Sequence, residues 1–240
     1  MSRWLQIRTV IDRAAAAALL VLISPFIAVL GLVVRLRDGA PSFITVPRVG
    51  RGGQVFGMWK IRSMTASQPD GRADGIGLSS TEDHRITPTG RWLRSYYLDE
   101  LPQLVNVVAG RMSLLGPRPE APEFVDADDP LWHDVLAAPP GIAGPTQLLV
   151  SAWEDRHIND SPTGRQYVEV VLPVKLAIDR WYVTRSSPRL DILVLGSLAR
   201  RLVGRSGVPA LTERVRAQVP EAEQIPNHDT PADPHLSPGL

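Results

Sequence analysis

Hydrophobic residues dominate one continuous stretch near the N-terminus. From Ala14 to Val34 the chain reads AAAAALLVLISPFIAVLGLVV, and only Ser24 and Pro25 interrupt the apolar and small residues. A helix needs about 20 such residues to span a bilayer. The pattern therefore predicts a helix that contacts lipid.

Three structures fit this stretch: a cleaved signal peptide, a spanning helix, and a hairpin that enters the bilayer and returns. A signal peptide is disfavoured because the charged run RLRDG follows directly, where a small-residue cleavage site belongs. Arginines flank both ends of the stretch, at Arg3, Arg8, Arg13, Arg35, Arg37, Arg48 and Arg51. Because basic flanks favour the cytoplasmic side, this symmetry favours the hairpin.

Ser24 and Pro25 supply the expected break at mid-depth. Proline removes a backbone donor and clashes with the carbonyl of Val21, and a serine hydroxyl can satisfy a freed carbonyl where water is absent. These residues predict a kinked, re-entrant helix. A spanning helix with a tolerated proline stays open as an alternative.

Two short runs rich in β-branched and aromatic residues follow, within SFITVPRVGRGGQVFGMWKIRSM. The turn residues Gly50 to Gly53 separate them, which predicts a β-hairpin. The glycine spacing does not match G-x-G-x-x-G and no helix follows, so a dinucleotide-binding loop is rejected. Residues 65–82 are polar and glycine-rich, and predict a surface loop.

A helical period appears beside two adjacent carboxylates, Asp99 and Glu100. Apolar residues recur at i, i+3, i+4 and i+7, namely Leu101, Leu104, Val105 and Val108. Pro102 is tolerated only in a first turn, so the helix is expected to start at about Asp99, with Asp99 as its N-cap. Acidic residues at a helix start contribute about 0.5 to 2 kcal/mol each. The pair therefore has a purely structural explanation.

Two further helices are predicted, over residues 167–183 and 191–203, the first bent at Pro173. Their broad apolar faces suit either a helix in the membrane interface or one buried in a core. From Ser206 onward proline and polar residues dominate, which predicts a disordered tail.

Composition narrows the possible functions. The 240-residue chain has a net charge of +1, which gives no electrostatic support for nucleic-acid binding. It has no cysteine, so disulfides and thiolate metal sites are excluded. Nearly all basic residues are arginine, which suits phosphate. Arg118 lies between two prolines that restrict its backbone, which favours an anion clamp.

The order of these motifs resembles the bacterial monotopic polyprenol-phosphate phosphoglycosyl transferases, which initiate exopolysaccharide, O-antigen and glycoprotein pathways. The resemblance runs from about Arg13 to Arg201. It is carried by RVGRGGQVFGMWKIRSM, DHRITPTGRWLR, LDELPQLVNVVAGRMSLLGPRPE, PPGIAGPTQL and YVEVVLPVKLAIDRWYV, besides the Ser-Pro apolar segment. The chain is expected to be a small form that consists of the catalytic domain only.

The resemblance implies a mixed α/β, mainly helical, monotopic fold. Residues 1–37 would form an N-terminal re-entrant membrane helix hairpin. Residues 38–205 would form a cytoplasmic catalytic domain with a short β-hairpin and interfacial amphipathic helices, and residues 206–240 a disordered proline-rich tail. The expected location is the cytoplasmic face of the bacterial inner membrane.

The resemblance also implies the reaction. A sugar-1-phosphate would pass from a nucleoside diphosphate sugar, expected to be a UDP-sugar, to undecaprenyl phosphate. Asp99 would attack the β-phosphate and form a covalent phosphosugar intermediate, and Glu100 and Asp99 would hold Mg²⁺. The partners would be both substrates and inner-membrane lipid, with no nucleic acid, and a homodimer is compatible with the sequence.

Four basic residues match family positions that contact substrate. Arg94 matches the arginine assigned to the polyprenol phosphate, while Arg118, Lys60 and Arg62 match positions near the diphosphate. Ser24 and Pro25 match the pair that turns the membrane helix back.

The sequence departs from the family pattern in a few places. Tyr97 stands where a small hydroxyl residue usually precedes Leu-Asp-Glu, Pro47 replaces a common Gln, and GIAG replaces GITG. Tyr97 is the one feature that supports an alternative, a catalytically inactive membrane-tethered interaction protein on the same scaffold. The sugar and the base stay open.

Overall fold

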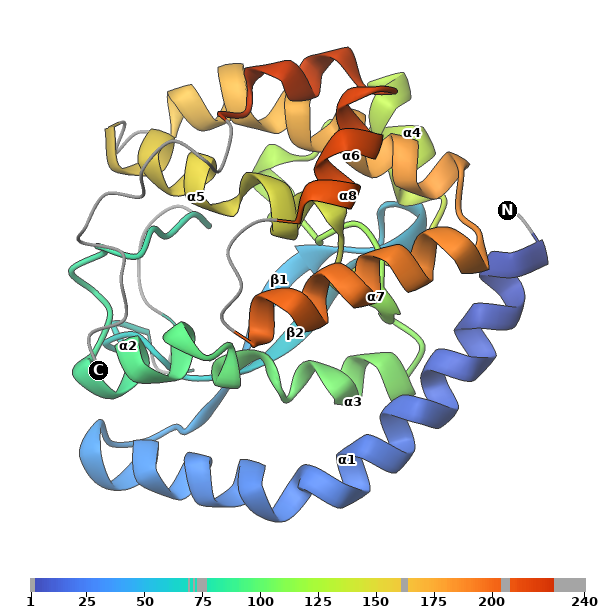
Figure 1. Cartoon of the computed structure of the whole chain (residues 1–240). Helices are drawn as coiled ribbons and strands as arrows, with labels where there is room; N and C mark the ends of the chain where they lie inside the picture. Colours follow the sequence, from blue (N-terminus) through green and yellow to red (C-terminus); the bar gives the residue numbers. More distant parts are fainter. Residues whose placement is uncertain are drawn as a thin grey trace.

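A computed structural model gives the structure of the chain (Figure 1). It describes residues 3–68, 70, 72, 77–160, 164–203 and 208–226, without the side chains of Arg3, Asp160 and Leu202. Most of these residues lie in helices, and two short two-stranded sheets accompany them. The mixed, mainly helical class expected from the sequence is confirmed.

Helix α1, Arg3–Arg37, is continuous and bends in its middle along one side of the molecule (Figure 1). The Ser24 hydroxyl donates to the carbonyl of Val21 at 3.0 Å, which is the carbonyl that Pro25 cannot satisfy. By length and composition α1 could cross a membrane. The bend agrees with a kinked helix, and the re-entrant topology stays a prediction.

One side of α1 packs on the protein, and the other is apolar and exposed. Ala16, Leu30 and Val34 are buried. The large apolar side chains exposed on α1 are Ile7, Val10, Ile11, Leu19, Val21, Leu22, Phe26, Val29, Leu32 and Leu36. A continuous apolar surface of this length is a property of membrane-contacting helices.

The N-terminal half of α1 is joined to the core by buried charges. Arg8 donates to Asp191 at 3.1 Å, to Tyr182 Oη at 2.9 Å and to the carbonyl of Leu115 at 3.0 Å. Asp12 accepts the backbone N–H of Leu114 at 3.1 Å. Arg8 is thus a structural residue. Its charge is paired inside the protein, so it does not count among the basic residues that flank the apolar segment.

Strands β1, Phe43–Val49, and β2, Val55–Ile61, form the predicted antiparallel hairpin. Their turn contains the short 3₁₀ helix η1, Arg51–Gly53, in which Gly52 and Gly53 have φ of 67° and 77°. Only glycine adopts such left-handed angles without strain, so the hairpin prediction from this turn is confirmed.

The segment around the two carboxylates differs from the prediction. Helix α2, Pro88–Ser95, is followed by a separate 3₁₀ turn η2, Leu98–Glu100, and helix α3 begins only at Gln103 and ends at Val108. Tyr97, with φ of 55°, turns the chain between α2 and η2. The expectation that Asp99 caps the helix is therefore wrong, because α3 starts after Pro102.

Strand β3, Ser113–Leu115, pairs in parallel with β4, Gly141–Ala143. Between them lie η3, Pro122–Phe124, and helix α4, Pro130–Leu136. Helix α5, Pro145–Asp160, follows. The sequence pattern predicted neither α4 nor α5.

Helix α6, Leu172–Thr184, follows a π-helical turn η4, Tyr167–Val171, which agrees with the predicted bend at Pro173. Nine residues of α6 are buried, and six of them lie in the main hydrophobic core, so α6 is not the expected interfacial helix. Helix α7, Pro188–Leu202, exposes Ile192 and Leu195, and its interfacial role stays a prediction.

The disordered tail predicted from residue 206 is wrong for residues 208–226. These form helix α8, Pro209–Arg216, and η5, Pro220–Gln224, packed near α5 and α6 (Figure 1). Six apolar residues of this segment are buried: Val208, Leu211, Val215, Val219, Ala222 and Ile225. Their helical spacing was obscured by the surrounding prolines and charges. Residues 206, 207 and 227–240 lie outside the described residues.

Candidate active site

Four charged side chains from three parts of the chain meet at η2. Lys60, from β2, places Nζ 3.6 Å from Asp99 Oδ2 and 3.2 Å from Glu100 Oε1. Arg118, from the loop after β3, donates to Glu100 Oε2 at 3.1 Å and also to Oε1. Such a two-point arginine–carboxylate contact fixes geometry as well as charge. The structure thus brings together four of the candidate site residues, Lys60, Asp99, Glu100 and Arg118, and their roles toward substrate stay predictions.

The backbone that carries Arg118 is held closely against β4. Gly116 N–H donates to the carbonyl of Ala143 at 2.9 Å, and Gly141 N–H donates to the carbonyl of Pro117 at 2.8 Å. A Cβ on Gly116 would lie 2.7 Å from the backbone nitrogen of Gly141, so only glycine fits there. The side chain of Arg118 therefore extends from a rigid, tightly packed turn.

Opposite charges keep Glu100 ionised. Burial alone would raise the pKa of this carboxyl, but the charges and hydrogen bonds of Arg118 and Lys60 lower it to about 2. Burial likewise opposes the charge of Arg118, yet the carboxylate of Glu100 raises the pKa of Arg118 above its ordinary value. The pair is permanently charged at neutral pH.

Asp99 has a different environment from its neighbour. Both oxygens of Glu100 accept hydrogen bonds, whereas Asp99 accepts none from the described residues and has Lys60 as its ion-pair partner. Its side chain is 6% exposed, beside Lys60 at 20% and Arg118 at 26%. Asp99 therefore keeps oxygens that accept no hydrogen bond from the described residues, while Glu100 is held in place.

The fit of a metal ion depends on these two carboxylates. In the part of the chain that the structure describes, no group of three or more His, Asp or Glu side chains could hold a metal ion. Mg²⁺, however, often binds through one or two carboxylates and takes its other ligands from water and substrate phosphates. Asp99 and Glu100 fit that form, with Asp99 the more available ligand.

Arg62 is not part of this group, although the sequence placed it near the diphosphate. Its residue exposure is 2%, and its guanidinium donates to the carbonyls of Asp38, Gly39 and Ala40 at 2.5, 2.8 and 2.9 Å. Carbonyls at the end of a helix favour a cation. Arg62 therefore secures the exit of α1, and the substrate-binding prediction for it is wrong.

Arg94 lies on the last turn of α2, a helix that contacts η2. It donates to Ser79 Oγ at 2.7 Å. Burial and Glu154 raise the pKa of nearby Asp155 to about 6, and the charge of Arg94 opposes that rise. The described contacts of Arg94 do not include the two carboxylates, and its role toward the lipid phosphate stays a prediction.

Sequence reasoning missed several charged residues around Arg118. Arg48, on β1, donates to the carbonyl of Gly77 at 3.1 Å, and burial and the charge of Arg118 lower its pKa, against the attraction of Glu120. Lys175 lies in a second buried ion cluster with Glu120. The sequence offered one signal for each residue. Arg48 lies in the RVG run of the predicted hairpin, and Lys175 is one of two lysines in the chain. Neither signal indicated which residue would be the partner.

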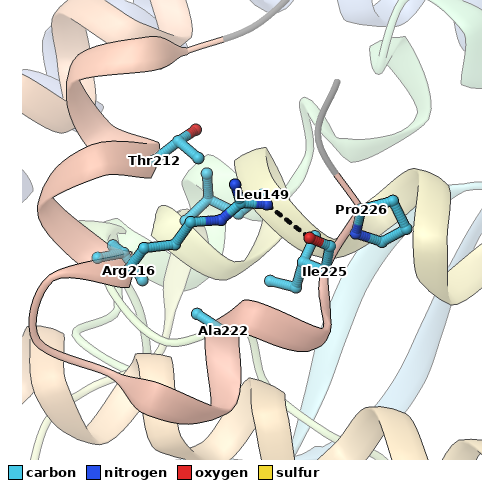
Figure 2. Close-up of a pocket in the computed structure, with 7 residues that line it drawn as sticks. Leu149, Thr212, Arg216, Ala222, Ile225 and Pro226 are labelled. Atoms are coloured by element: carbon cyan, nitrogen blue, oxygen red, sulfur yellow. Dashed lines mark hydrogen bonds between the residues drawn. The ribbon is translucent and has the colours of Figure 1, made fainter. Parts of the chain in front are cut away.

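An apolar cavity lies elsewhere, between α5, α8 and η5 (Figure 2). Leu149, Ala222 and Ile225 line it, and Arg216 donates to the carbonyl of Ile225 at 2.6 Å across it. It contains no carboxylate, so it lacks the chemistry of the η2 site.

Comparison with known proteins identifies the family of the chain. The family model described as bacterial sugar transferase matches residues 3–205. The chain is 36% identical to an undecaprenyl-phosphate glucose phosphotransferase of Komagataeibacter xylinus over 60% of the chain. It is 32% identical to the uncharacterized sugar transferase EpsL of Bacillus subtilis over 84%, and 36% identical to a UDP-glucose:undecaprenyl-phosphate glucose-1-phosphate transferase of Caulobacter vibrioides over 59%.

The relatives differ in length from this chain. The matched region covers 28% of the Komagataeibacter protein, 53% of the Caulobacter protein and 90% of EpsL. The region that contains η2, β2 and the Arg118 loop lies within the family match.

Proposed function

The chain belongs to the bacterial sugar transferase family, and on that premise we propose that it moves a sugar-1-phosphate from a nucleoside diphosphate sugar to undecaprenyl phosphate. The observation that carries this proposal is the reactive oxygen of Asp99 beside a Glu100 whose oxygens are both bound. Two of the relatives are named for transfer of glucose units to undecaprenyl phosphate, and one name specifies UDP-glucose. A UDP-sugar is therefore the proposed donor class.

In the first step, an oxygen of Asp99 attacks the β-phosphorus of the donor. A P–O bond forms to Asp99, and the bond from that phosphorus to the oxygen bridging the α-phosphate breaks. The nucleoside monophosphate leaves with the bond's electron pair. Lys60 and Arg118 stabilise the negative charge on the phosphate oxygens, which is the main contribution a protein makes to phosphoryl transfer.

In the second step, a phosphate oxygen of undecaprenyl phosphate attacks the same phosphorus. The bond to Asp99 breaks, the carboxylate is regenerated, and a polyprenyl-diphosphate-linked sugar is released. Arg94 is the proposed contact for the lipid phosphate. Mg²⁺ held by Asp99 and Glu100 would supply further neutralisation of phosphate charge.

Trapping of the intermediate tests the proposal directly. The membrane-reconstituted protein is incubated with a panel of radiolabelled nucleotide sugars without lipid acceptor, and its intact mass is measured. We expect release of nucleoside monophosphate and a phosphosugar adduct on Asp99. Asp99→Asn should give neither.

Two results would count against this mechanism in different ways. Turnover of wild-type protein without any adduct would exclude the covalent route. No monophosphate release and no lipid-linked product with any sugar would exclude the donor class and favour an inactive, membrane-tethered interaction protein.

The family and the apolar helix α1 indicate membrane association. We further propose that both ends of α1 face the cytoplasm at the inner membrane. Single cysteines introduced at Ser2 and Ser42 in this cysteine-free chain should both be labelled only from the cytoplasmic side. Labelling from opposite sides would establish a spanning helix instead.

A further inference from the structure

A carboxamide side chain joins the strand that carries Lys60 to the helix that follows the two carboxylates. Asn106, on α3, donates from Nδ2 to the carbonyl of Gly57 at 2.8 Å, and its Oδ1 accepts the backbone N–H of Trp59 at 2.9 Å. Asn106 is 2% exposed. Both bonds reach the backbone of β2, and the proposed reaction gives Asn106 no role.

These two bonds occupy the edge of β2 that faces away from β1. Residues two apart in a strand direct their backbone groups to the same edge. Pro47 of β1 lies opposite Gly57 and has no N–H to donate to it. A two-stranded hairpin is marginally stable by itself. The carboxamide of Asn106 therefore takes the place of one residue of a neighbouring strand, and fixes β2 against α3.

The helical side of this joint is continuous with the two carboxylates. Leu101 and Pro102, which connect η2 to α3, both have right-handed helical backbone angles. Asp99, Glu100 and Asn106 therefore belong to one helical segment. The bonds of Asn106 attach β2 to the same segment that carries the carboxylates.

Lys60 directly follows the residue whose N–H Asn106 accepts. Its Nζ lies 3.6 Å from Asp99 Oδ2 and 3.2 Å from Glu100 Oε1. A lysine ammonium is carried on a flexible four-carbon chain, so its place beside the carboxylates depends on where its backbone is fixed. The two bonds of Asn106 fix that backbone relative to η2.

We propose that Asn106 is a positioning residue, which holds the backbone of β2 at α3 and so places the Lys60 ammonium beside Asp99 and Glu100. Its described hydrogen bonds go to backbone groups, and it acts through Lys60, whose charge stabilises the phosphate oxygens in the proposed reaction. This inference rests on the proposed function, since the position of Lys60 affects turnover only if phosphoryl transfer occurs at Asp99.

A double-mutant cycle tests the route through Lys60. Release of nucleoside monophosphate is measured for the full-length, membrane-reconstituted wild type, Asn106→Ala, Lys60→Met and the double variant. We expect Asn106→Ala to lower kcat/KM by up to about 100-fold, the loss that a displacement of about 1 Å can cause in an active site. In the Lys60→Met background the same change should have almost no further effect, because residues that act through one group are not additive. Losses that multiply in the double variant would overturn the proposal.

A second measurement reports the position of Lys60 without turnover. The chain has two lysines, Lys60 and Lys175. A carbodiimide joins a lysine to a carboxylate in contact with it, so it can link Lys60 to Glu100 and Lys175 to Glu154. Peptide mass spectrometry distinguishes the two links. Asn106→Ala should lower the yield of the Lys60 link several-fold and leave the Lys175 link, which reports the folded state, unchanged. A Lys60 link at wild-type yield would contradict the positioning role.

Gln218→Ala is the matched control. It removes a carboxamide that accepts the indole N–H of Trp181 at 2.9 Å, in the C-terminal segment, and should leave both measurements unchanged. If Asn106→Ala does not fold, Asn106→Asp takes its place: this variant keeps the shape and the acceptor for Trp59 but cannot donate to Gly57. Wild-type kcat/KM in Asn106→Asp would refute the inference.

Asp99→Asn, run in the same assay, separates the two proposals. If it retains wild-type release, the proposed function fails, and the cross-link alone decides whether Asn106 places Lys60. If Asp99→Asn is inactive while Asn106→Ala matches wild type, only the positioning role fails.

Discussion

The ion pairs around Glu100 and those around Lys175 use the same kinds of residue but leave different capacity for chemistry. The three donors of the Lys175 ammonium meet Glu120, Glu154 and Tyr167. At η2, Lys60 and Arg118 are partly exposed, and Asp99 has oxygens that accept no hydrogen bond from the described residues. Oxygens without a hydrogen bond and access to solvent, more than residue type, separate the cluster at η2 from the Lys175 cluster.

The largest expected effect comes from Asp99, whose oxygens accept no hydrogen bond from the described residues. Asp99→Asn should lower transfer by about 10⁴-fold or more, as expected for a nucleophile, and should leave the midpoint of thermal unfolding within a few degrees of wild type. Kinetics of monophosphate release and a thermal melt in detergent measure both. A variant that is inactive because it is unfolded would break the comparison.

Removing the lysine of each cluster should lower the free energy of unfolding by different amounts. Lys175→Met leaves buried carboxylates without their cation and should lower the free energy of unfolding by about 3 to 5 kcal/mol. Lys60→Met should cost less, because the Lys60 ammonium is partly exposed and Arg118 still neutralises Glu100. Urea unfolding in detergent measures both values, and equal losses would show that burial does not distinguish the two clusters.

The pH dependence of stability tests Asp179, a buried carboxyl affected by the charges of the Lys175 cluster. Burial raises the pKa of Asp179 to about 7, although Thr146 donates to it and Lys175 attracts it. A carboxyl whose folded pKa is raised favours the folded state at low pH, and that contribution is lost as pH rises from about 4 to 7. Asp179→Asn should therefore stabilise the protein at pH 8, by at most about 4 kcal/mol.

The matching measurement for Asp179 is unfolding at pH 4 and at pH 8. The gain from Asp179→Asn should be present at pH 8 and small at pH 4. A gain of the same size at both values would mean that the effect does not come from the ionisation of Asp179, and would contradict the assignment.

The smallest expected effect is the relief of backbone strain at Tyr97, two residues before Asp99. Tyr97 has φ of 55°, which costs a non-glycine residue about 1 to 2 kcal/mol. Tyr97→Gly should raise the free energy of unfolding by up to about 1 kcal/mol, since glycine also loses more entropy on folding. Tyr96→Gly is the control: its φ is −112°, so that change should destabilise. Destabilisation by Tyr97→Gly would show that the tyrosine ring, through packing, outweighs the strain.

Features encoded over short distances could be predicted from the sequence. The hairpin follows from turn glycines between two β-rich runs, and the Ser24–Val21 hydrogen bond follows from the adjacent proline. The meeting of Lys60, Asp99, Glu100 and Arg118 came from the family resemblance, because the spacing of residues far apart in the chain does not specify contact.

The predictions from the sequence are wrong where contacts between residues far apart in the chain determine the structure. Arg62 is two residues from Lys60, yet it serves the end of α1 because those carbonyls lie beside it only in the folded chain. Asp99 was expected to cap a helix, but a left-handed Tyr97 and the late start of α3 place it in a separate turn. Residues 208–226 looked too polar to fold, and their few apolar side chains pack onto a surface formed by α5 and α6.

Helix α1 is hydrogen-bonded to β3, through Arg8 to the carbonyl of Leu115 and through Asp12 to the backbone N–H of Leu114. These bonds have a practical consequence. A water-soluble fragment obtained by deleting α1 would leave Asp191 and Tyr182 without their shared guanidinium, and would expose the strand that leads into the Arg118 turn. Shortening the protein to ease purification would thus disturb the candidate active site along with the exposed apolar surface of α1. Biochemistry on this protein calls for the intact helix in a bilayer or a mild detergent.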